Sequence, residues 1–135
     1  MSLVLDTGIV FAYYDRSDDW HARARAVMNR RRGTLILPAP VIPEIDHLLG
    51  ARLGREARMV FYDGLVGGHY YIADLPRHAY RRVVDIHRQF SDLDLGFVDA
   101  AVVAIAIGMG IPRVATSDRR HFAPLAKGFG LELLP

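Results

Sequence analysis

The chain has 135 residues, 51% of them hydrophobic, and this length is enough for one domain, expected over residues 1–135, to bury a core without disulfides. Charged residues make up 24% of the chain, yet the formal net charge is only +2. There is no cysteine, which excludes a disulfide scaffold, a zinc–thiolate site and a thiol nucleophile.

Short apolar runs alternate with longer helical patterns along the chain, as is typical of an α/β fold. Five of these runs are continuous enough to be parallel strands that are covered on both faces. They are residues 3–5, 35–37, 70–73, 113–115 and 131–134. We therefore expect five strands in one central sheet.

The segments between the strands carry apolar residues at the period of an α-helix. The stripes expected to face the core are Ile45, Leu48, Leu49 and Leu53, then Ala57, Val60, Phe61 and Leu65, and then Tyr80, Val83, Val84, His87 and Phe90. Pro43 suits the first turn of a helix, which places Glu44 in that same turn.

A helix predicted over residues 97–109 is apolar nearly all round, so it should be central and buried. Gly108 and Gly110 end it before Pro112. This segment contains the longest apolar stretch of the chain, which is interrupted by Asp99 and is too short to span a bilayer. We therefore expect no membrane association and a cytoplasmic location.

Four acidic residues stand where an apolar run gives way to a helix start: Asp6, Glu44, Asp99 and Asp118. Parallel strands end at one edge of a sheet, so carboxylates that follow them can converge there. Carboxylates packed together must take up protons or bind a cation, and oxygen ligands suit Mg²⁺, with Mn²⁺ as a substitute. Each residue alone has a simpler explanation as a helix cap or as a partner of the helix dipole. Asp99 is the most informative, because no basic residue neighbours it in an apolar helix start.

The motifs around these residues form an ordered set: Leu3-Val4-Leu5-Asp6-Thr7-Gly8, Glu44 after the second strand, Phe97-Val98-Asp99-Ala100, and Thr116-Ser117-Asp118 followed by His121-Phe122. Over essentially the whole chain this set resembles the PIN domain, and more closely the VapC-type toxin ribonucleases of toxin–antitoxin pairs. The resemblance implies a three-layer α/β/α sandwich around a central, mainly parallel five-stranded sheet.

The same resemblance implies metal-dependent cleavage of single-stranded or loop RNA. It makes Asp6, Glu44, Asp99 and Asp118 an acidic quartet in which Asp6 and Asp99 are the firmest Mg²⁺ ligands. It also implies two partners besides RNA, a small antitoxin encoded beside the toxin and a second copy in a homodimer. A groove between the helices near residues 44–53 and 55–65 could receive a partner helix, although core packing explains those helices equally well.

Other residues form a second tier of candidates. Asp94 precedes Asp99 by five positions, and a role as an exposed turn residue explains it at least as well. Thr7 and either Thr116 or Ser117 could orient a metal-bound water, although capping is the commoner role. Tyr13 or Tyr14 could stack on a base, and an arginine-rich region could hold phosphates or be a solvated helix face. That region contains Arg23, Arg25, Arg30, Arg31 and Arg32.

Three alternative functions use similar residues. A phosphatase of the haloacid-dehalogenase type needs a second acid two positions after its nucleophile, where this chain has Gly8. A receiver domain needs a well-placed lysine, and the sole lysine, Lys127, lies in a late, glycine-flanked segment. The third is a catalytically idle module of the PIN fold that only binds RNA or protein. Loss of a quartet member would indicate it, and all four are present.

Overall fold

The computed structural model describes residues 1–30 and 33–135. The strands are β1 (Leu3–Leu5), β2 (Leu35–Pro38), β3 (Tyr71–Ala73), β4 (Arg113–Ala115) and β5 (Glu132–Leu134). The α-helices are α1 (Thr7–Tyr14), α2 (His21–Arg30), α3 (Ile42–Arg52), α4 (Arg55–Val66), α5 (Tyr80–Gln89), α6 (Phe97–Met109) and α7 (Arg119–Phe129). Short 3-10 turns occur at Ala39–Val41, Arg77–Ala79 and Ser91–Leu93.

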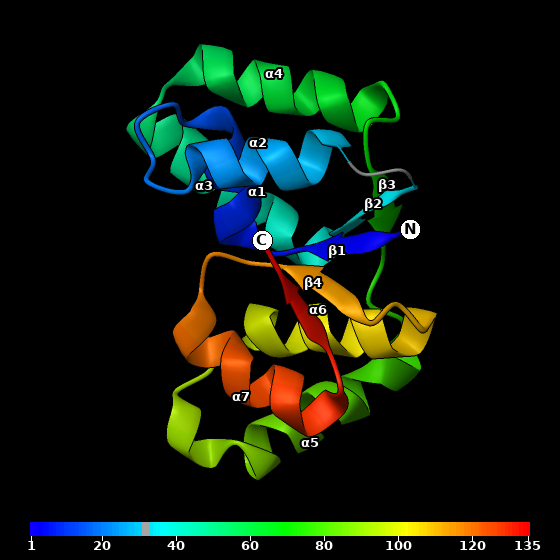
Figure 1. Ribbon diagram of the computed structural model, residues 1–135. Helices are drawn as coiled ribbons and strands as arrows, with labels where there is room; N and C mark the ends of the chain where they lie inside the picture. The colour runs from blue at the N-terminus through cyan, green and yellow to red at the C-terminus, as the bar shows by residue number, and fades with distance from the viewer. Residues whose placement is uncertain (31–32) are drawn as a thin grey trace.

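The five strands form one sheet in the order β3-β2-β1-β4-β5, and every pairing is parallel. Helices α1 to α4 cover one face of the sheet and α5 to α7 cover the other (Figure 1). The expected three-layer α/β/α sandwich is therefore confirmed. The hydrophobic runs explain this arrangement, because a strand covered on both faces cannot expose alternate residues to water.

The core is deepest around β1 and α6. All three residues of β1 are buried, and α6 is buried continuously from Ala100 to Ala106, as its apolar composition predicts. In α3, Ile45 and Leu49 are buried, and Pro43 with Glu44 lies in the first turn as expected. Among the described residues, no helix reaches the length and apolar character that a bilayer crossing requires.

Several predictions of burial were wrong. In α5 the buried residues are Val83 and Ile86, whereas Tyr80 and Val84 are exposed and His87 is only half-buried. The exposed apolar residues lie beside the buried face of this amphipathic helix. The sequence pattern placed them on that face because apolar residues also occur on the solvent side of the helix.

The strand β3 also departs from the prediction of burial on both faces. Tyr71 and Ile72 are exposed, because β3 lies at the edge of the sheet and pairs only with β2. Two residues on the predicted helix stripes are exposed as well: Leu53, the C-cap of α3, and Val60 on α4, whose neighbour Phe61 is buried. Sequence periodicity locates a helix face but does not show which apolar side chains lie at its margin.

Candidate active site

The strand order reverses at β1, and this gives the sheet a natural binding edge. The chain builds outward from β1 to β2 and β3, and then crosses to β4 and β5 on the other side. In open parallel sheets, ligands bind beyond the carboxyl ends of the strands at such a reversal. Here β1 leads into Asp6, and β4, its neighbour, leads into Thr116. The Asp6 amide donates a hydrogen bond of 3.0 Å to the Ala115 carbonyl oxygen, which joins the two strand ends.

Asp6 is the deeply buried carboxylate of this edge. Its side chain is only 5% exposed, and its Oδ2 atom accepts a hydrogen bond of 2.9 Å from the Thr116 hydroxyl. The pKa of Asp6 is raised to about 7, chiefly by burial and in part by the charges of Asp99 and Asp118, against the lowering effect of the Thr116 hydroxyl and the Thr7 amide. The fold therefore opposes ionisation of this carboxyl group.

Asp99 lies in the first turn of α6 and is half-buried. Its Oδ2 atom accepts a hydrogen bond of 3.1 Å from the Gly96 amide, which holds the side chain at the helix start. Burial is the largest cause that raises its pKa, and the charges of Asp118 and Glu44 add to it, whereas the Gly96 amide and His121 lower it. Asp99 is less buried than Asp6, which is the most buried carboxylate of the quartet.

Glu44 and Asp118 complete the edge from two more helices. Glu44 is exposed, and its Oε1 atom accepts a hydrogen bond of 2.6 Å from the Thr7 hydroxyl at the start of α1. Asp118 caps α7: its Oδ1 atom accepts from the His121 amide at 3.1 Å, and its Oδ2 atom lies 2.8 Å from His121 Nδ1. The imidazole of His121 therefore fixes the orientation of this carboxylate.

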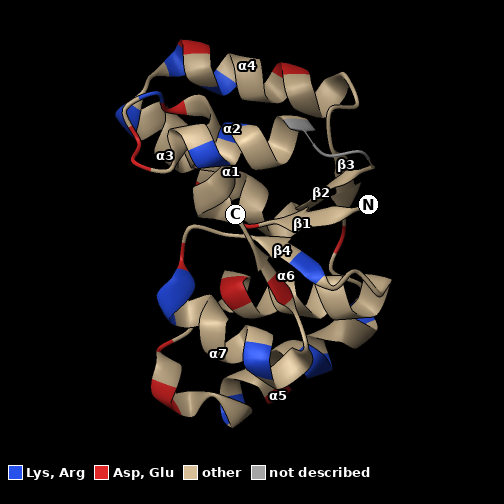
Figure 2. Cartoon of the chain, viewed as in Figure 1, with Lys and Arg blue, Asp and Glu red and all other residues tan. Residues whose placement is uncertain are grey.

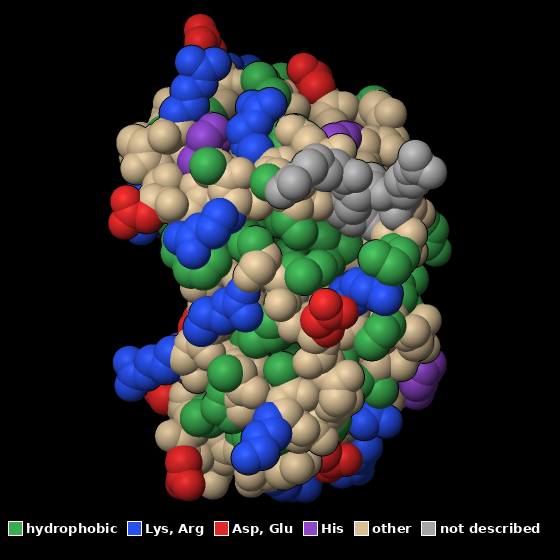
Figure 3. Space-filling model, viewed as in Figure 1, with side chains coloured by type: hydrophobic (Ala, Val, Ile, Leu, Met, Phe, Trp, Pro, Cys, Tyr) green, Lys and Arg blue, Asp and Glu red, His purple; other side chains and the backbone are tan. Residues whose placement is uncertain are grey.

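The acidic quartet converges electrostatically. The pKa of Asp6 responds to Asp99 and Asp118, and the pKa of Asp99 responds to Asp118 and Glu44, so no member is isolated from the others. Figure 2 shows acidic positions at the start of α6 and in the segment that leads into α7, on one side of the molecule. On that side the surface is notched, and positively charged side chains stand on both rims of the notch (Figure 3).

The second-tier hydroxyls and Asp94 have distinct environments. The Thr116 side chain is fully buried, donates to Asp6 and accepts from the Asp118 amide at 2.9 Å, so it positions carboxylates. The Ser117 hydroxyl packs against Gly8, where an added Cβ would lie 2.5 Å from its oxygen. Asp94 is exposed and has a left-handed backbone with φ of 48°, a conformation typical of turns.

The tyrosines are held by the protein itself. The hydroxyl groups of Tyr14 and Tyr70 lie 2.7 Å apart, and the Tyr14 ring packs edge-on against Phe61. The Tyr13 hydroxyl donates a hydrogen bond of 3.2 Å to Asn29 on α2. Base stacking by Tyr14 is therefore disfavoured, since its ring already packs between α1, α4 and the residue that precedes β3.

Two of the predicted phosphate-binding arginines are supported by aromatic rings. The Arg23 guanidinium lies 3.7 Å from the centre of the Trp20 ring, and that of Arg25 lies 5.6 Å from the centre of the Tyr13 ring. Such contacts restrain a cation and leave its charge available to solvent. The part of the prediction that concerns the side chains of Arg30, Arg31 and Arg32 lies outside what the structure describes.

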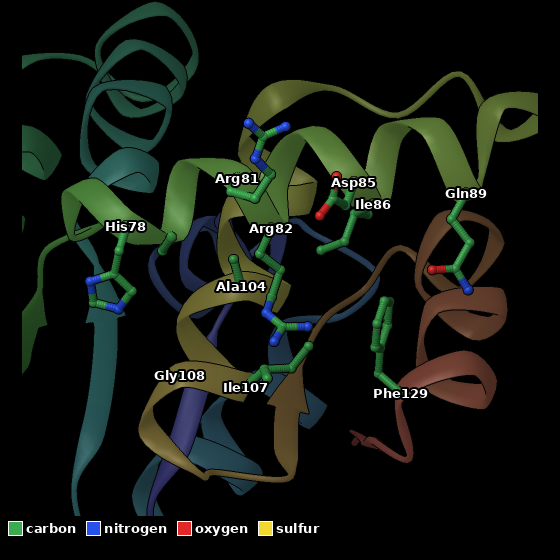
Figure 4. Close-up of a pocket in the computed structure, with 11 residues that line it drawn as sticks. His78, Arg81, Arg82, Asp85, Ile86, Gln89, Ala104, Ile107, Gly108 and Phe129 are labelled. Atoms are coloured by element: carbon green, nitrogen blue, oxygen red, sulfur yellow. The ribbon is translucent and has the colours of Figure 1, made fainter.

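A separate cavity of about 380 Å³ lies between α5, α6 and α7 (Figure 4). Its polar lining includes His78, Arg81, Arg82 and Asp85, and no member of the acidic quartet lines it. It lies against Ala104 and Gly108 in the C-terminal half of α6, whereas Asp99 is at the opposite end of that helix. This cavity is therefore separate from the acidic edge, which is identified by the charge of its side chains.

The donor chemistry of the acidic edge suits a hard divalent cation, which prefers oxygen ligands. Burial and mutual charge oppose the ionised forms of Asp6 and Asp99, and a bound cation would offset both effects. Among the residues described, no group of three or more His, Asp or Glu side chains is already arranged to hold a metal ion. The carboxylates would therefore have to draw together on binding.

The sequence of this chain matches a known domain family and a known ribonuclease over most of its length. The PIN domain family matches residues 3–128. Ribonuclease VapC26 of Mycobacterium tuberculosis is 28% identical over 123 residues, which cover 91% of each chain.

Solved structures share the fold at lower identity. The M. tuberculosis toxin VapC20, described as cleaving the sarcin–ricin loop, superposes with a TM-score of 0.83 at 19% identity and covers 98% of this chain and 99% of that one. VapBC2 of Rickettsia felis, solved with a DNA fragment from its promoter, gives 0.73 at 16% identity, with 98% and 97% covered. FitAcB of Neisseria gonorrhoeae gives 0.73 at 15% identity, with 98% and 96% covered.

Proposed function

This chain belongs to the PIN domain family, and from that premise we propose that it is a Mg²⁺-dependent endoribonuclease, a VapC-type toxin that cleaves single-stranded or loop RNA in the cytoplasm. The observation that carries the proposal is the buried carboxylate of Asp6 beyond the end of β1, on which the charges of Asp99 and Asp118 act, with Glu44 and Asp118 acting in turn on Asp99. Similarity to Ribonuclease VapC26 over 91% of the chain supports RNA as the substrate.

Asp6, Asp99, Glu44 and Asp118 are the residues that would hold the cation, with Mn²⁺ as a substitute for Mg²⁺. When bound, the metal would lower the pKa of a water molecule and neutralise charge on the phosphate under attack. Other side chains of the protein orient these carboxylates. The Thr116 hydroxyl orients Asp6, and His121 orients Asp118. Thr7 restrains Glu44, whose exposed side chain borders the surface that RNA would approach.

The partners belong to the same proposal. We propose a small antitoxin as the regulator, supported by the fold shared with VapBC2, which was solved with promoter DNA. Helices α3 and α4 pack together, and α4 leaves Met59 and Val60 exposed, so a partner helix could bury them. A homodimer stays a prediction from the family resemblance.

A cleavage assay with matched variants tests the nuclease. Purified protein is incubated with an unstructured RNA and a stem–loop RNA, in Mg²⁺ or in EDTA. Asp99→Asn preserves shape but removes a metal-binding charge, so cleavage should fall at least about a hundredfold. Asp94→Asn makes the same change at an exposed turn five residues earlier and should cut like wild type. Equal cutting by Asp99→Asn and wild type, or cutting that survives EDTA, would favour the idle binding module.

A further inference from the structure

A second cavity adjoins the acidic edge on the side of α3. It has a volume of about 490 Å³ and is open to solvent, and it is lined by Thr7, Pro43, Glu44, His47 and Leu48. Two of these residues, Thr7 and Glu44, are joined by the 2.6 Å hydrogen bond described above. The cavity and the candidate active site therefore share one wall.

Helix geometry places the lining residues on one face of α3. His47 lies three residues after Glu44 and Leu48 lies four residues after it, so both side chains project from the same face as the carboxylate. Pro43 and Leu48 supply apolar walls, and the exposed imidazole of His47 supplies a flat ring with two nitrogens. The lining thus combines apolar surface with a few polar groups, as small-ligand sites do.

Charge decides which part of an RNA chain this cavity can take. The Glu44 carboxylate in the wall repels phosphate, whereas an uncharged base presents apolar faces and hydrogen-bonding edges. A base is also small enough to stack on one imidazole ring, and aromatic stacking is the usual way in which proteins hold unpaired bases. The neighbouring phosphate would then lie towards the acidic quartet.

We propose that this cavity, lined by His47 and Leu48, is a base-binding subsite for a nucleotide that flanks the cleaved phosphate, and that it contributes to the choice of cleavage site. The inference rests on the proposed ribonuclease activity. His47 acts in it as a specificity-determining residue that contacts the base through its ring. Leu48 supplies apolar surface beside the same base.

The first test measures base preference. Wild type, His47→Ala and Leu48→Ala are incubated with a single-stranded RNA pool of random sequence, and the cut sites are mapped by sequencing the new ends. Both variants should lower the preference at one position beside the cut by about tenfold, while the rate on disfavoured sequences stays near wild type. His78→Ala is the matched control, because it removes an exposed histidine that lines the cavity of Figure 4. It should leave the preference unchanged.

A second test needs no cleavage. The ring protons of His47 are followed by nuclear magnetic resonance in the Asp99→Asn variant while a short single-stranded RNA is added. Stacking on a base should move these signals upfield, and Leu48→Ala in the same background should weaken the shift. The ring of His78 should not respond.

The two proposals fail in different ways. If wild type shows no metal-dependent cleavage, the proposed function fails, and the resonance test decides alone whether the cavity takes a base. If wild type cuts RNA but both cavity variants keep its base preference, or if they slow all sequences equally, the base subsite is wrong. Unchanged cut sites would instead leave the cavity as a docking point for a partner protein.

Discussion

The hydroxyl of Thr116 donates a 2.9 Å hydrogen bond to the Oδ2 atom of Asp6, a residue 110 positions earlier in the chain. Both residues are buried, and each directly follows one of two paired strands. This bond ties the most buried carboxylate of the acidic edge to the reversal point of the sheet. It therefore links the stability of the fold to the ionisation of Asp6.

The first prediction concerns the dependence of stability on pH without metal. Burial raises the pKa of folded Asp6 from its ordinary value of 3.8 to about 7. Below about pH 4 the Asp6 carboxyl is protonated in both the folded and the unfolded chain, so its contribution to the free energy of unfolding is fully present. That contribution is lost as the pH rises from about 4 through 7, the range in which only the folded chain still holds the proton. The loss should amount to roughly 4 kcal/mol.

Urea unfolding of wild type and Asp6→Asn in EDTA, between pH 4 and 8, measures this contribution. Asn keeps an oxygen acceptor for Thr116 and cannot ionise, so the variant should become the more stable protein at pH 8. Parallel curves for the two proteins across this range would contradict the raised pKa of Asp6.

The second prediction is that divalent metal stabilises the protein. Mn²⁺ or Mg²⁺ would relieve repulsion among the quartet in the folded state and would bind the unfolded chain weakly. The thermal midpoint at pH 7 should therefore rise in millimolar Mn²⁺, and Asp99→Asn should reduce that rise. Asp94→Asn, the matched change at the exposed turn, should respond like wild type. A midpoint that does not move in Mn²⁺ would argue against a shared cation site.

The third prediction separates the two roles of Thr116. Thr116→Val keeps the shape but removes the donor to Asp6 and the acceptor for the Asp118 amide, so it should destabilise the protein by about 1 to 3 kcal/mol. Because the hydroxyl lowers the pKa of Asp6, the valine variant should also lose stability at higher pH than wild type does.

Thr116→Ser is the control for this prediction, since it retains the hydroxyl and loses one methyl group. The serine variant should lose about 0.8 kcal/mol of stability, and its stability should fall over the same pH range as that of wild type. If serine and valine shift that pH range equally, the hydrogen bond has no part in the ionisation of Asp6.

The fourth prediction concerns the arginines on α2. If Arg23 and Arg25 hold RNA phosphates, replacing both by alanine should reduce the slope of log affinity against log salt by about 1 to 2. Filter binding of a single-stranded RNA to the Asp99→Asn protein, at several salt concentrations, measures the slope. The double variant Arg77→Ala, Arg88→Ala on and before α5 serves as a charge-matched control. An unchanged slope in the α2 variant would make these arginines a solvated helix face.

Local sequence patterns predicted the strands, because apolar runs of only three or four residues between turns are too short for a helix and fit strands of a covered sheet. They also predicted the helix starts at Glu44 and Asp99, which follow from proline placement and a sustained apolar segment. They could not rank the burial of the carboxylates. Asp6 is deeper than Asp99 because β1 occupies the centre of the sheet, and strand order depends on long-range packing.

The role of His121 was missed although a local signal was present. It lies three residues after Asp118, the spacing at which a helix cap and a first-turn side chain meet. The pairing of Thr7 with Glu44 and of Thr116 with Asp6 had no such signal, since each joins residues that are distant in the chain. Only the assembled sheet brings those side chains into contact.

The strand order also governs when the carboxylate cluster can form during synthesis. Asp6 and Glu44 precede β3, whereas Asp99 and Asp118 follow it, and β4 can insert beside β1 only after β2, β3 and α6 have been made. A nascent chain that has just emerged through β3 therefore holds half of the cluster. If the folded protein cuts RNA, the ribosome that makes it is not exposed to an assembled site until the segment through Asp118 has emerged.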